Sequence, residues 1–236
     1  MASKSQVLPE SFYARDVRQV ARELIGCKLL HAGVGGIIVE TEAYSRDDPA
    51  CHASRGMTAR NRVMFGPPGR AYVYFTYGMH HLLNIVSEEE GSPAGVLIRA
   101  LEPTDGIEAM LARRAPVRQI PQLCNGPGKL AAALGVDLSH YGIPVFRGSL
   151  KVCRPQADWQ EPAIVSTPRI GISVGTRREW RYCAADSGFL SRKLTRKERA
   201  HEIAGSLRAG GRVGHQGRPA GQARGRAAAE EAERGV

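Results

Sequence analysis

The chain lacks three features that would direct its chemistry elsewhere. It has no CxxC pair among five scattered cysteines, no apolar run of the ~18 residues that a membrane helix needs, and no lysine between Leu29 and Gly128. The odd number and wide spacing of the cysteines argue against a disulfide framework and a tetrahedral zinc site. The first residues, MASKSQVLPE, lack the apolar stretch of a secretory signal. We therefore expect a cytoplasmic protein without a metal, a cofactor or a membrane contact.

The positive charge is spread unevenly along the chain. The formal net charge is +10, and residues 191–236 hold eleven Lys and Arg against five Asp and Glu, whereas residues 1–190 hold 22 against 18. The longer part is only mildly basic, so charge alone does not identify a nucleic-acid binder. Residues 191–236 are rich in Gly, Ala and Arg, which predicts a disordered basic tail. This tail could attract phosphates, or it could be a solvated extension without a role.

The N-terminal part predicts a helix followed by a strand pair. Asp16 can cap a helix whose apolar positions follow a spacing of three and four residues, and Gly26 comes after its end. A strand at 28–31 then turns through the glycine-rich segment 33–36 into the strand VETEAY at 39–44.

The later part adds strands and one short helix. An apolar strand covers 95–101, Thr104 is expected to cap a helix that ends near Arg114, and 169–174 has the pattern of another strand. These elements predict a mixed α/β fold. We expect a single domain over residues 1–190, with a curved, largely antiparallel sheet surrounded by helices and a protruding β-hairpin.

The protruding hairpin is predicted from two apolar runs, AYVYFT (71–76) and HLLNIV (81–86), joined around Tyr77 and Gly78. Glycine supplies the turn conformation, which puts Tyr77 at an exposed tip. A large aromatic side chain there is costly in water unless it stacks or wedges against a partner, and the base steps of a duplex are one such partner. The alternative is that Tyr77 packs back on its own hairpin.

The strand VETEAY carries two carboxylates that fall on one face. Glu40 and Glu42 alternate with Val39, Thr41 and Ala43, and successive side chains of a strand point to opposite sides. One of the two carboxylates can therefore point into a cleft.

Two cations stand in informative surroundings. Arg99 interrupts an apolar strand, so it either extends outward to solvent or pairs with a buried carboxylate. Gly126, Gly128 and Lys129 lie at the glycine-rich start of a helix that continues through 130–134. Free backbone N–H groups and the helix dipole make these three residues a candidate phosphate site. The alternative is a plain loop-to-helix turn.

Six segments, in this order, resemble the alkyladenine (3-methyladenine) DNA glycosylase family, in its bacterial form. They are VETEAY, the loop with His52, TARNRVMFGPPG, YVYFTYGMH with Asn84, LIRALEP and LCNGPGKLAAALG. One such segment would be weak support, but six in register over roughly residues 10 to 190 are specific. The resemblance implies a hydrolase of N-glycosyl bonds, namely a monofunctional DNA glycosylase of base excision repair.

The resemblance assigns the chemistry to two residues. A glycosylase takes a damaged base out of the stack and breaks its bond to deoxyribose with water or a lysine. The lysine-free stretch disfavours a Schiff base, and water needs a carboxylate to orient and deprotonate it. Glu42 matches the catalytic position of the family, with Glu40 as the neighbour that could be confused with it. Arg99 would hold the water and favour the ionised form of Glu42.

The resemblance also assigns the binding residues. Tyr44, His52 and Tyr74 match the aromatic residues that stack on the flipped base. Asn84 matches the position that disfavours the exocyclic amino group of normal guanine. Tyr77 matches the residue that enters the minor groove and fills the space left by the base. The implied partner is double-stranded DNA with damaged purines, bound by a monomer in the nucleoid.

Two other classes of function remain open. A metal-dependent nuclease would lose its activity with a chelator, and its candidate ligands are Glu40, Glu42, Asp47, Asp48 and His52. A non-catalytic module would bind distorted DNA through Tyr77 and the basic tail but release no base.

Overall fold

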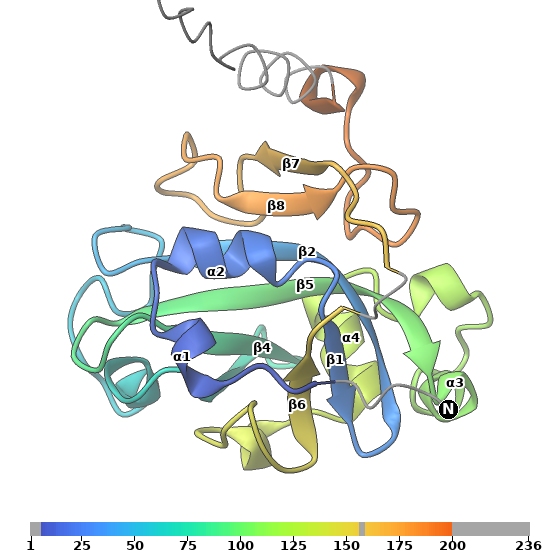
Figure 1. Ribbon diagram of the computed structural model, residues 1–236, viewed down its shortest axis with the longest axis horizontal. Coiled ribbons are helices and arrows are strands. Elements are labelled where there is room, and N and C mark those ends of the chain that lie inside the picture. Colours follow the sequence, from blue (N-terminus) through green and yellow to red (C-terminus); the bar gives the residue numbers. More distant parts are fainter. Residues whose placement is uncertain (1–5, 156–158, 200–236) are drawn as a thin grey trace, which may run out of the picture.

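The structure is a computed structural model that describes residues 6–155 and 159–199. Its centre is an eight-stranded antiparallel sheet in the order β3-β4-β5-β2-β1-β6, in which β8 also pairs with β2 and β7 pairs with β8 (Figure 1). The strands are β1 (Lys28–His31), β2 (Val34–Tyr44), β3 (Ala71–Thr76), β4 (His80–Ser87), β5 (Ala94–Asp105), β6 (Leu150–Cys153), β7 (Ile164–Thr167) and β8 (Arg181–Ala184).

Short helices surround this sheet. The α-helices of the described residues are α1 (Glu10–Tyr13), α2 (Val17–Glu23), α3 (Ile107–Arg113) and α4 (Pro127–Leu134), and the 3-10 helices are η1 (Arg62–Phe65), η2 (Ile120–Gln122) and η3 (Leu138–His140). Within these described ranges, no helix has the length and the apolar character needed to cross a bilayer.

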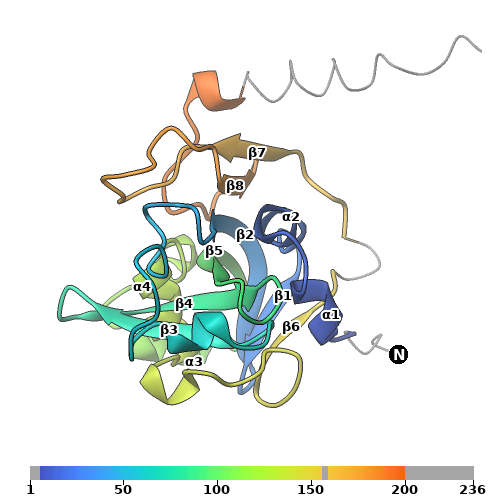
Figure 2. The ribbon, with the colours of Figure 1, turned by 90° about the vertical axis from the view of Figure 1, so that its left-hand side faces the viewer.

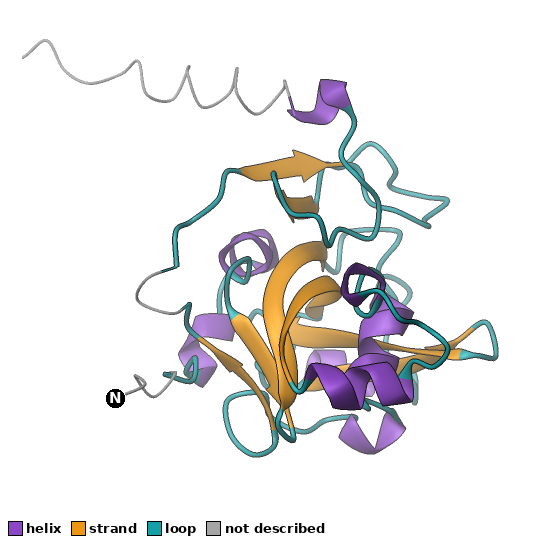
Figure 3. Ribbon diagram, turned by 90° about the vertical axis from the view of Figure 1, so that its right-hand side faces the viewer, coloured by secondary structure: helices purple, strands orange, loops and turns teal. Residues whose placement is uncertain are grey.

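The sheet is strongly curled, and the β3–β4 hairpin projects from it (Figures 2 and 3). This arrangement confirms the predicted mixed α/β fold with a curved antiparallel sheet and a protruding hairpin. Two helices cover the sheet from different directions, since α2 packs on β2 and β5 while α4 packs on β4 and β5. The Asp16 side chain accepts hydrogen bonds from the backbone of Arg18 and Gln19, so it caps α2 as expected.

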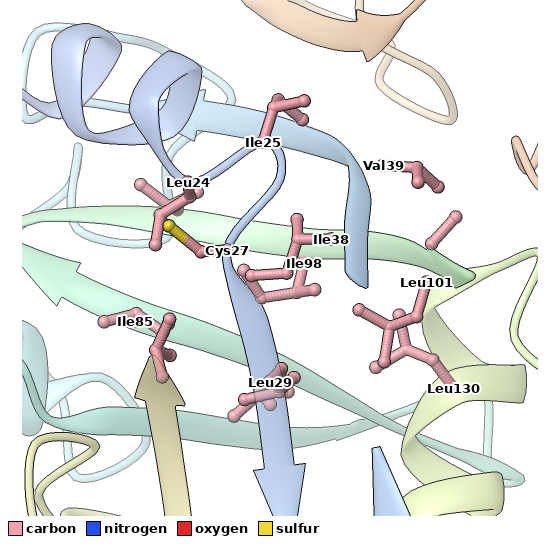
Figure 4. Close-up of a cluster of buried hydrophobic side chains, with 14 of the residues drawn as sticks. Leu24, Ile25, Cys27, Leu29, Ile38, Val39, Ile85, Ile98, Leu101 and Leu130 are labelled. Atoms are coloured by element: carbon pink, nitrogen blue, oxygen red, sulfur yellow. The ribbon is translucent and has the colours of Figure 1, made fainter. Parts of the chain in front are cut away.

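The central strand is β2, because it is paired along both edges. It pairs with β5 from Gly35 to Tyr44, with β1 at its start, and with β8 at Glu40–Glu42. Apolar side chains from the sheet, α2 and α4 fill the core around it (Figure 4). Paired edges and covered faces leave a polar side chain on β2 almost no access to water. The consequence is that Glu40 and Glu42 are fully buried.

Three sequence expectations need correction. Thr104 lies inside β5, which continues to Asp105, and the cap residue of α3 is Gly106 in a left-handed conformation. The glycine-rich segment 33–36 contains the turn only at its beginning, because β2 already starts at Val34. The strand predicted at 169–174 is also wrong, because β7 ends at Thr167 and these residues form an irregular loop.

The domain extends beyond the predicted boundary at residue 190. Leu190 and Leu194 are buried in the main core, and Ser191 donates two hydrogen bonds to Glu40. The start of the predicted tail is therefore part of the packed domain, because Leu194 is buried in the core and Ser191 bonds to a residue far away in sequence. Residues 200–236, the remainder of the predicted tail, lie outside the described residues.

We expect Gly36→Ala to destabilise the fold by about 2 kcal/mol or more, since a Cβ atom at this position would lie 2.1 Å from the carbonyl oxygen of Glu102 on the paired strand. Neither backbone can move without disturbing the sheet. Urea denaturation would measure the change in the free energy of unfolding. Gly188→Ala is the control, because its added Cβ meets no atom within 4 Å, and it should change stability by less than about 0.5 kcal/mol. Equal stability of the two variants would contradict the close packing of β2 on β5.

Candidate active site

A cavity of about 460 Å³ opens beside the hairpin. Its walls come from the sheet, from the loop that follows β2, and from the loop that follows β7. Six residues singled out in the sequence line it together: Tyr44, His52, Tyr74, Tyr77, Asn84 and Arg99. Side chains from positions 44 to 99 thus converge on one space large enough for a purine base.

Glu42 lies directly behind the wall of this cavity. Its Oε2 atom accepts hydrogen bonds from the Tyr44 hydroxyl at 2.7 Å and from Arg99 Nη1 at 3.2 Å, and its Oε1 atom accepts one from the backbone N–H of Ile170 at 2.8 Å. All three donor residues line the cavity. The carboxylate is therefore buried and accepts three hydrogen bonds, one of them from a charged arginine. A single layer of residues separates it from the space that a ligand would occupy.

Glu40 occupies the same face of β2 but faces away from the cavity lining. Its carboxylate accepts Arg181 Nε at 2.6 Å, Arg99 Nε at 3.2 Å, and the backbone N–H and hydroxyl of Ser191 at 2.6 and 2.7 Å. The predicted common face of Glu40 and Glu42 is confirmed, because Arg99 bridges the two carboxylates. Only Glu42 touches residues of the cavity other than Arg99.

The position of Arg99 decides between the two alternatives that its apolar surroundings left open, extension to solvent or pairing with a buried carboxylate. The side chain is buried and does not reach outward to solvent. Burial lowers the pKa of Arg99, but Glu42 and Glu40 outweigh this effect and raise the net pKa above its usual value. The guanidinium therefore stays charged beside both carboxylates.

Aromatic rings form the wall nearest to the hairpin. The ring centroids of His52 and Tyr74 are 4.6 Å apart, and those of Tyr72 and Tyr74 are 5.3 Å apart. The hydroxyl of Tyr72 also lies 2.8 Å from Nδ1 of His52. Tyr72 was missed in the sequence, although its spacing of two residues from Tyr74 places both rings on one face of β3.

Asn84 completes this wall from the neighbouring strand. It is buried, lines the cavity, and donates Nδ2–H to the carbonyl oxygen of Tyr72 at 3.3 Å. The amide is held by the sheet itself, since Tyr72 and Asn84 are paired residues of β3 and β4. A fixed amide at the edge of a cavity can select ligands by their hydrogen-bonding groups.

The buried phenol groups of Tyr44, Tyr72 and Tyr74 stay protonated. Burial raises the pKa of Tyr74 to about 12 and raises the pKa of Tyr72 still further above its usual value. Burial, together with the adjacent Glu42 carboxylate, also raises the pKa of Tyr44. The Tyr44 hydroxyl is therefore a hydrogen-bond donor to Glu42, which accepts as a carboxylate.

Tyr77 stands at the tip of the hairpin with 84% of its surface exposed. Exposure on this scale contradicts the alternative that the ring packs back on its own hairpin. Tyr77 and Gly78 both have positive φ angles, 51° and 67°, within the turn that joins β3 to β4. A positive φ is unfavourable for a bulky side chain, so the hairpin holds this ring outward at some cost.

The glycine-rich start of α4 lies beside His80, where β4 begins next to the turn of the hairpin. Pro127 lines the cavity, and a Cβ atom at Gly128 would lie 2.9 Å from the His80 ring. Lys129 is exposed and donates to the Asn125 side chain at 2.9 Å. The N-terminus of α4, with Gly126 as its cap, therefore opens on the side of the molecule where the hairpin projects.

Several residues of the site were not found from the sequence. The loop that follows β7 supplies Ile170 to Val174 to the cavity wall. Arg169 and Arg181 are buried and bind Asp48 and Glu40, respectively. The signal that singled out Arg99, a cation within a long apolar run, is weak here, since Arg169 follows Pro168 and Arg181 follows a single apolar residue, Trp180.

Three of the four carboxylates of the nuclease alternative, those of Glu40, Glu42 and Asp48, are held by arginine. Asp48 binds Arg169, while Glu40 and Glu42 share Arg99. In the part of the chain that the structure describes, no group of three or more His, Cys, Asp or Glu side chains is arranged to hold a metal ion.

Comparisons with known proteins identify the family of this chain. Residues 11–188 match the family model described as methylpurine-DNA glycosylase (MPG). A relative from Rhodopseudomonas palustris (strain HaA2) is 52% identical over 184 residues, which cover 78% of this chain and 90% of the relative. One from Bradyrhizobium diazoefficiens is 48% identical over 78% of this chain and 90% of its own, and one from Carboxydothermus hydrogenoformans is 45% identical over 79% and 100%. All three are named as candidate 3-methyladenine DNA glycosylases.

A cavity with an aromatic wall and a buried carboxylate behind it has the features that a hydrolase acting on a planar base requires. The chain belongs to the methylpurine-DNA glycosylase family. It is thus a DNA-repair enzyme that hydrolyses N-glycosyl bonds, with DNA as its substrate.

We expect His52 to titrate below its usual pKa of about 6.5. Its partial burial among the rings lowers the pKa, and the Arg60 charge lowers it further, so Arg60→Gln should raise it. NMR titration of the imidazole would measure both values. Arg55→Gln, on the same loop, removes an equal charge and serves as the control, and it should raise the pKa of His52 by less than Arg60→Gln does. An identical upward shift in both variants would show that overall charge, rather than the position of Arg60, controls His52.

Proposed function

We propose that this glycosylase is monofunctional, that it flips an alkylated or deaminated purine out of duplex DNA into the cavity, and that it hydrolyses the glycosyl bond with water. The class of bases comprises 3-methyladenine, 7-methylguanine, hypoxanthine and ethenoadenine, and the product strand carries an abasic site. The observation that carries the proposal is the buried carboxylate of Glu42 directly behind an aromatic cavity.

Glu42 is the proposed general base. A carboxylate can accept about four hydrogen bonds. Oε2 accepts two, from Tyr44 and Arg99, while Oε1 accepts one from Ile170 among the described residues. A water molecule can therefore bind at Oε1, where Glu42 would orient it, take its proton and favour the positive charge that develops on the sugar. Arg99 would keep the carboxylate in place.

The alternative nucleophile, a lysine amine, has little support in this site. None of the described residues that line the cavity is a lysine. Lys129 is exposed and its Nζ atom is hydrogen-bonded to Asn125. Release by water, without a Schiff base and without the strand cleavage that accompanies one, follows from this arrangement.

The aromatic wall supports a preference for damaged purines. The rings of Tyr44, His52 and Tyr74 present faces that attract an electron-poor alkylated base. Asn84 is fixed by the sheet at the edge of the cavity, where its amide would disfavour the exocyclic amino group of guanine. Selection would therefore combine stacking with one polar restriction.

Two neighbouring features would hold the duplex. The exposed Tyr77 ring would enter the minor groove and occupy the space that the flipped base leaves. Gly126, Gly128 and Lys129, at the start of α4 on the same side, would bind a backbone phosphate. One such arrangement serves one lesion, so we propose that the protein acts as a monomer on chromosomal DNA in the nucleoid.

Glu42→Gln should lower the rate of base release by about 100- to 10,000-fold, because the amide cannot take a proton from water. Single-turnover release of free base from a duplex with one hypoxanthine, with chelator present, would measure the loss. Affinity for the duplex should change little, since Glu42 is buried away from the DNA surface.

Glu40→Gln is the matched control, because Glu40 lies behind Arg99 and would not contact the water. Its release rate should fall by at most about tenfold. Wild-type release by Glu42→Gln would overturn the assignment of the base. Binding without release by the wild-type protein would favour a non-catalytic module, and metal-dependent strand cleavage would favour a nuclease.

Tyr77→Ala should weaken binding to a lesion-containing duplex by about 5- to 150-fold, the range that corresponds to the 1–3 kcal/mol of an aromatic contact with bases. Fluorescence anisotropy would measure the affinity, and 2-aminopurine fluorescence beside the lesion would report base flipping. Thermal stability should be unchanged, because the ring is 84% exposed. Met79→Ala, at the same tip and 67% exposed, tests whether the loss of any apolar side chain there weakens binding. Unchanged affinity in Tyr77→Ala would show that the tip is not a wedge.

A further inference from the structure

Arg169 connects two loops that both contribute to the wall of the cavity. It is buried at the start of the loop that follows β7, and its guanidinium binds both oxygens of Asp48 in the loop that follows β2. Figure 1 shows these two loops at the same end of the molecule. Arg169 Nη1 also donates to the carbonyl oxygen of Ala43 at 2.9 Å, and Nη2 contacts the carbonyl oxygen of Gly175 at 3.4 Å. One side chain therefore ties both walls to the end of β2.

The packing around this ion pair leaves no room for adjustment. A Cβ atom at Gly175 would lie 2.8 Å from Asp48 Oδ1 and 3.2 Å from Arg169 Nη2. Gly175 has a φ of +64°, which also favours glycine. Asp48 is completely buried, so the pair is shielded from solvent and from salt. A close approach of this kind fixes the distance between the two loops.

The ion pair is adjacent to the reacting end of the cavity. Ile170, the residue after Arg169, donates its backbone N–H to Glu42 Oε1 at 2.8 Å. The Arg169 guanidinium also lies 4.5 Å from the centroid of the Tyr44 ring, whose hydroxyl donates to Glu42 Oε2. Two of the three hydrogen bonds to Glu42 thus come from groups that Arg169 holds in place.

We propose that Arg169 and Asp48 form a positioning pair that aims the Ile170 N–H and the Tyr44 hydroxyl at Glu42, and so sets the orientation of the general base. This proposal rests on the proposed function, in which Glu42 activates water. Neither Arg169 nor Asp48 lines the cavity or touches the base. Their main effect on catalysis would therefore pass through the groups that bind Glu42.

The test is a double-mutant cycle in single-turnover release of hypoxanthine from a duplex. Arg169→Lys keeps the charge but loses the two-pronged contact with Asp48, and Asp48→Asn keeps the shape but loses the charge. Each should lower the release rate by about 10- to 100-fold, because small misplacements of a reacting group have effects of this size. Affinity for an abasic-site duplex should change by less than about threefold, since binding depends on phosphate and hairpin contacts.

The decisive comparison is made in the Glu42→Gln background. If Arg169 acts through Glu42, adding Arg169→Lys to Glu42→Gln should change the residual rate by less than about threefold. A full, additive loss in that background would show a role in general stability and overturn the proposal. Wild-type rates in both Arg169→Lys and Asp48→Asn would also overturn it. A fully active Glu42→Gln protein would instead refute the catalytic assignment itself, whatever the effect at Arg169.

A control separates positioning from loss of stability. Leu150→Ala removes a buried side chain from β6, which is not part of the cavity wall. Assayed at a temperature where the variants remain folded by circular dichroism, Leu150→Ala should release base at the wild-type rate, although its thermal midpoint falls as far as that of Arg169→Lys or further. Equal rate losses in the two variants would attribute the effect of Arg169→Lys to destabilisation.

Discussion

The active-site architecture depends on the burial of two carboxylates on one face of the central strand. Glu40 and Glu42 are both fully buried, and buried charges without partners are strongly unfavourable. Arg99 offsets this cost for both, because it donates to Glu40 through Nε and to Glu42 through Nη1. Arg181 supplies the second charge that Glu40 needs. Removing either arginine would leave a buried carboxylate with too little compensation, so the arginines and the strand form one unit.

Local sequence patterns were sufficient to predict the features whose residues lie close together in the chain. The alternation in VETEAY predicted the common face of the two carboxylates, and the two apolar runs around Gly78 predicted the hairpin and its exposed Tyr77. Both rest on the two-residue period of a strand and on the turn preference of glycine. The resemblance to a known family then joined these segments to Asn84 and Arg99, which the structure brings to one cavity.

The remaining features depend on contacts that no local pattern records. Arg181 meets Glu40 across 141 positions, and Ile170 meets Glu42 across 128. The strand expected at 169–174 failed for the same reason, because its apolar residues serve a cavity wall and not a sheet. Ser191 was assigned to a tail by composition, yet its hydrogen bonds to Glu40 make it part of the site. Composition describes a segment as a whole. It therefore misses the first residues of a segment when a hydrogen bond to a buried partner holds them in the domain.

The charges around Glu42 also bear on the selection of bases. Three buried arginines, Arg99, Arg169 and Arg181, face three buried carboxylates, Glu40, Glu42 and Asp48, so the formal charges cancel. This balanced set supplies no net negative charge to attract a cationic alkylated purine, and Arg60 adds a positive charge that acts on His52 and Tyr74. In the proposed function, attraction would then come from short-range contacts with the rings of Tyr44, His52 and Tyr74. Stacking of that kind also accepts uncharged bases such as hypoxanthine and ethenoadenine, which supports the broad class of substrates proposed for this enzyme.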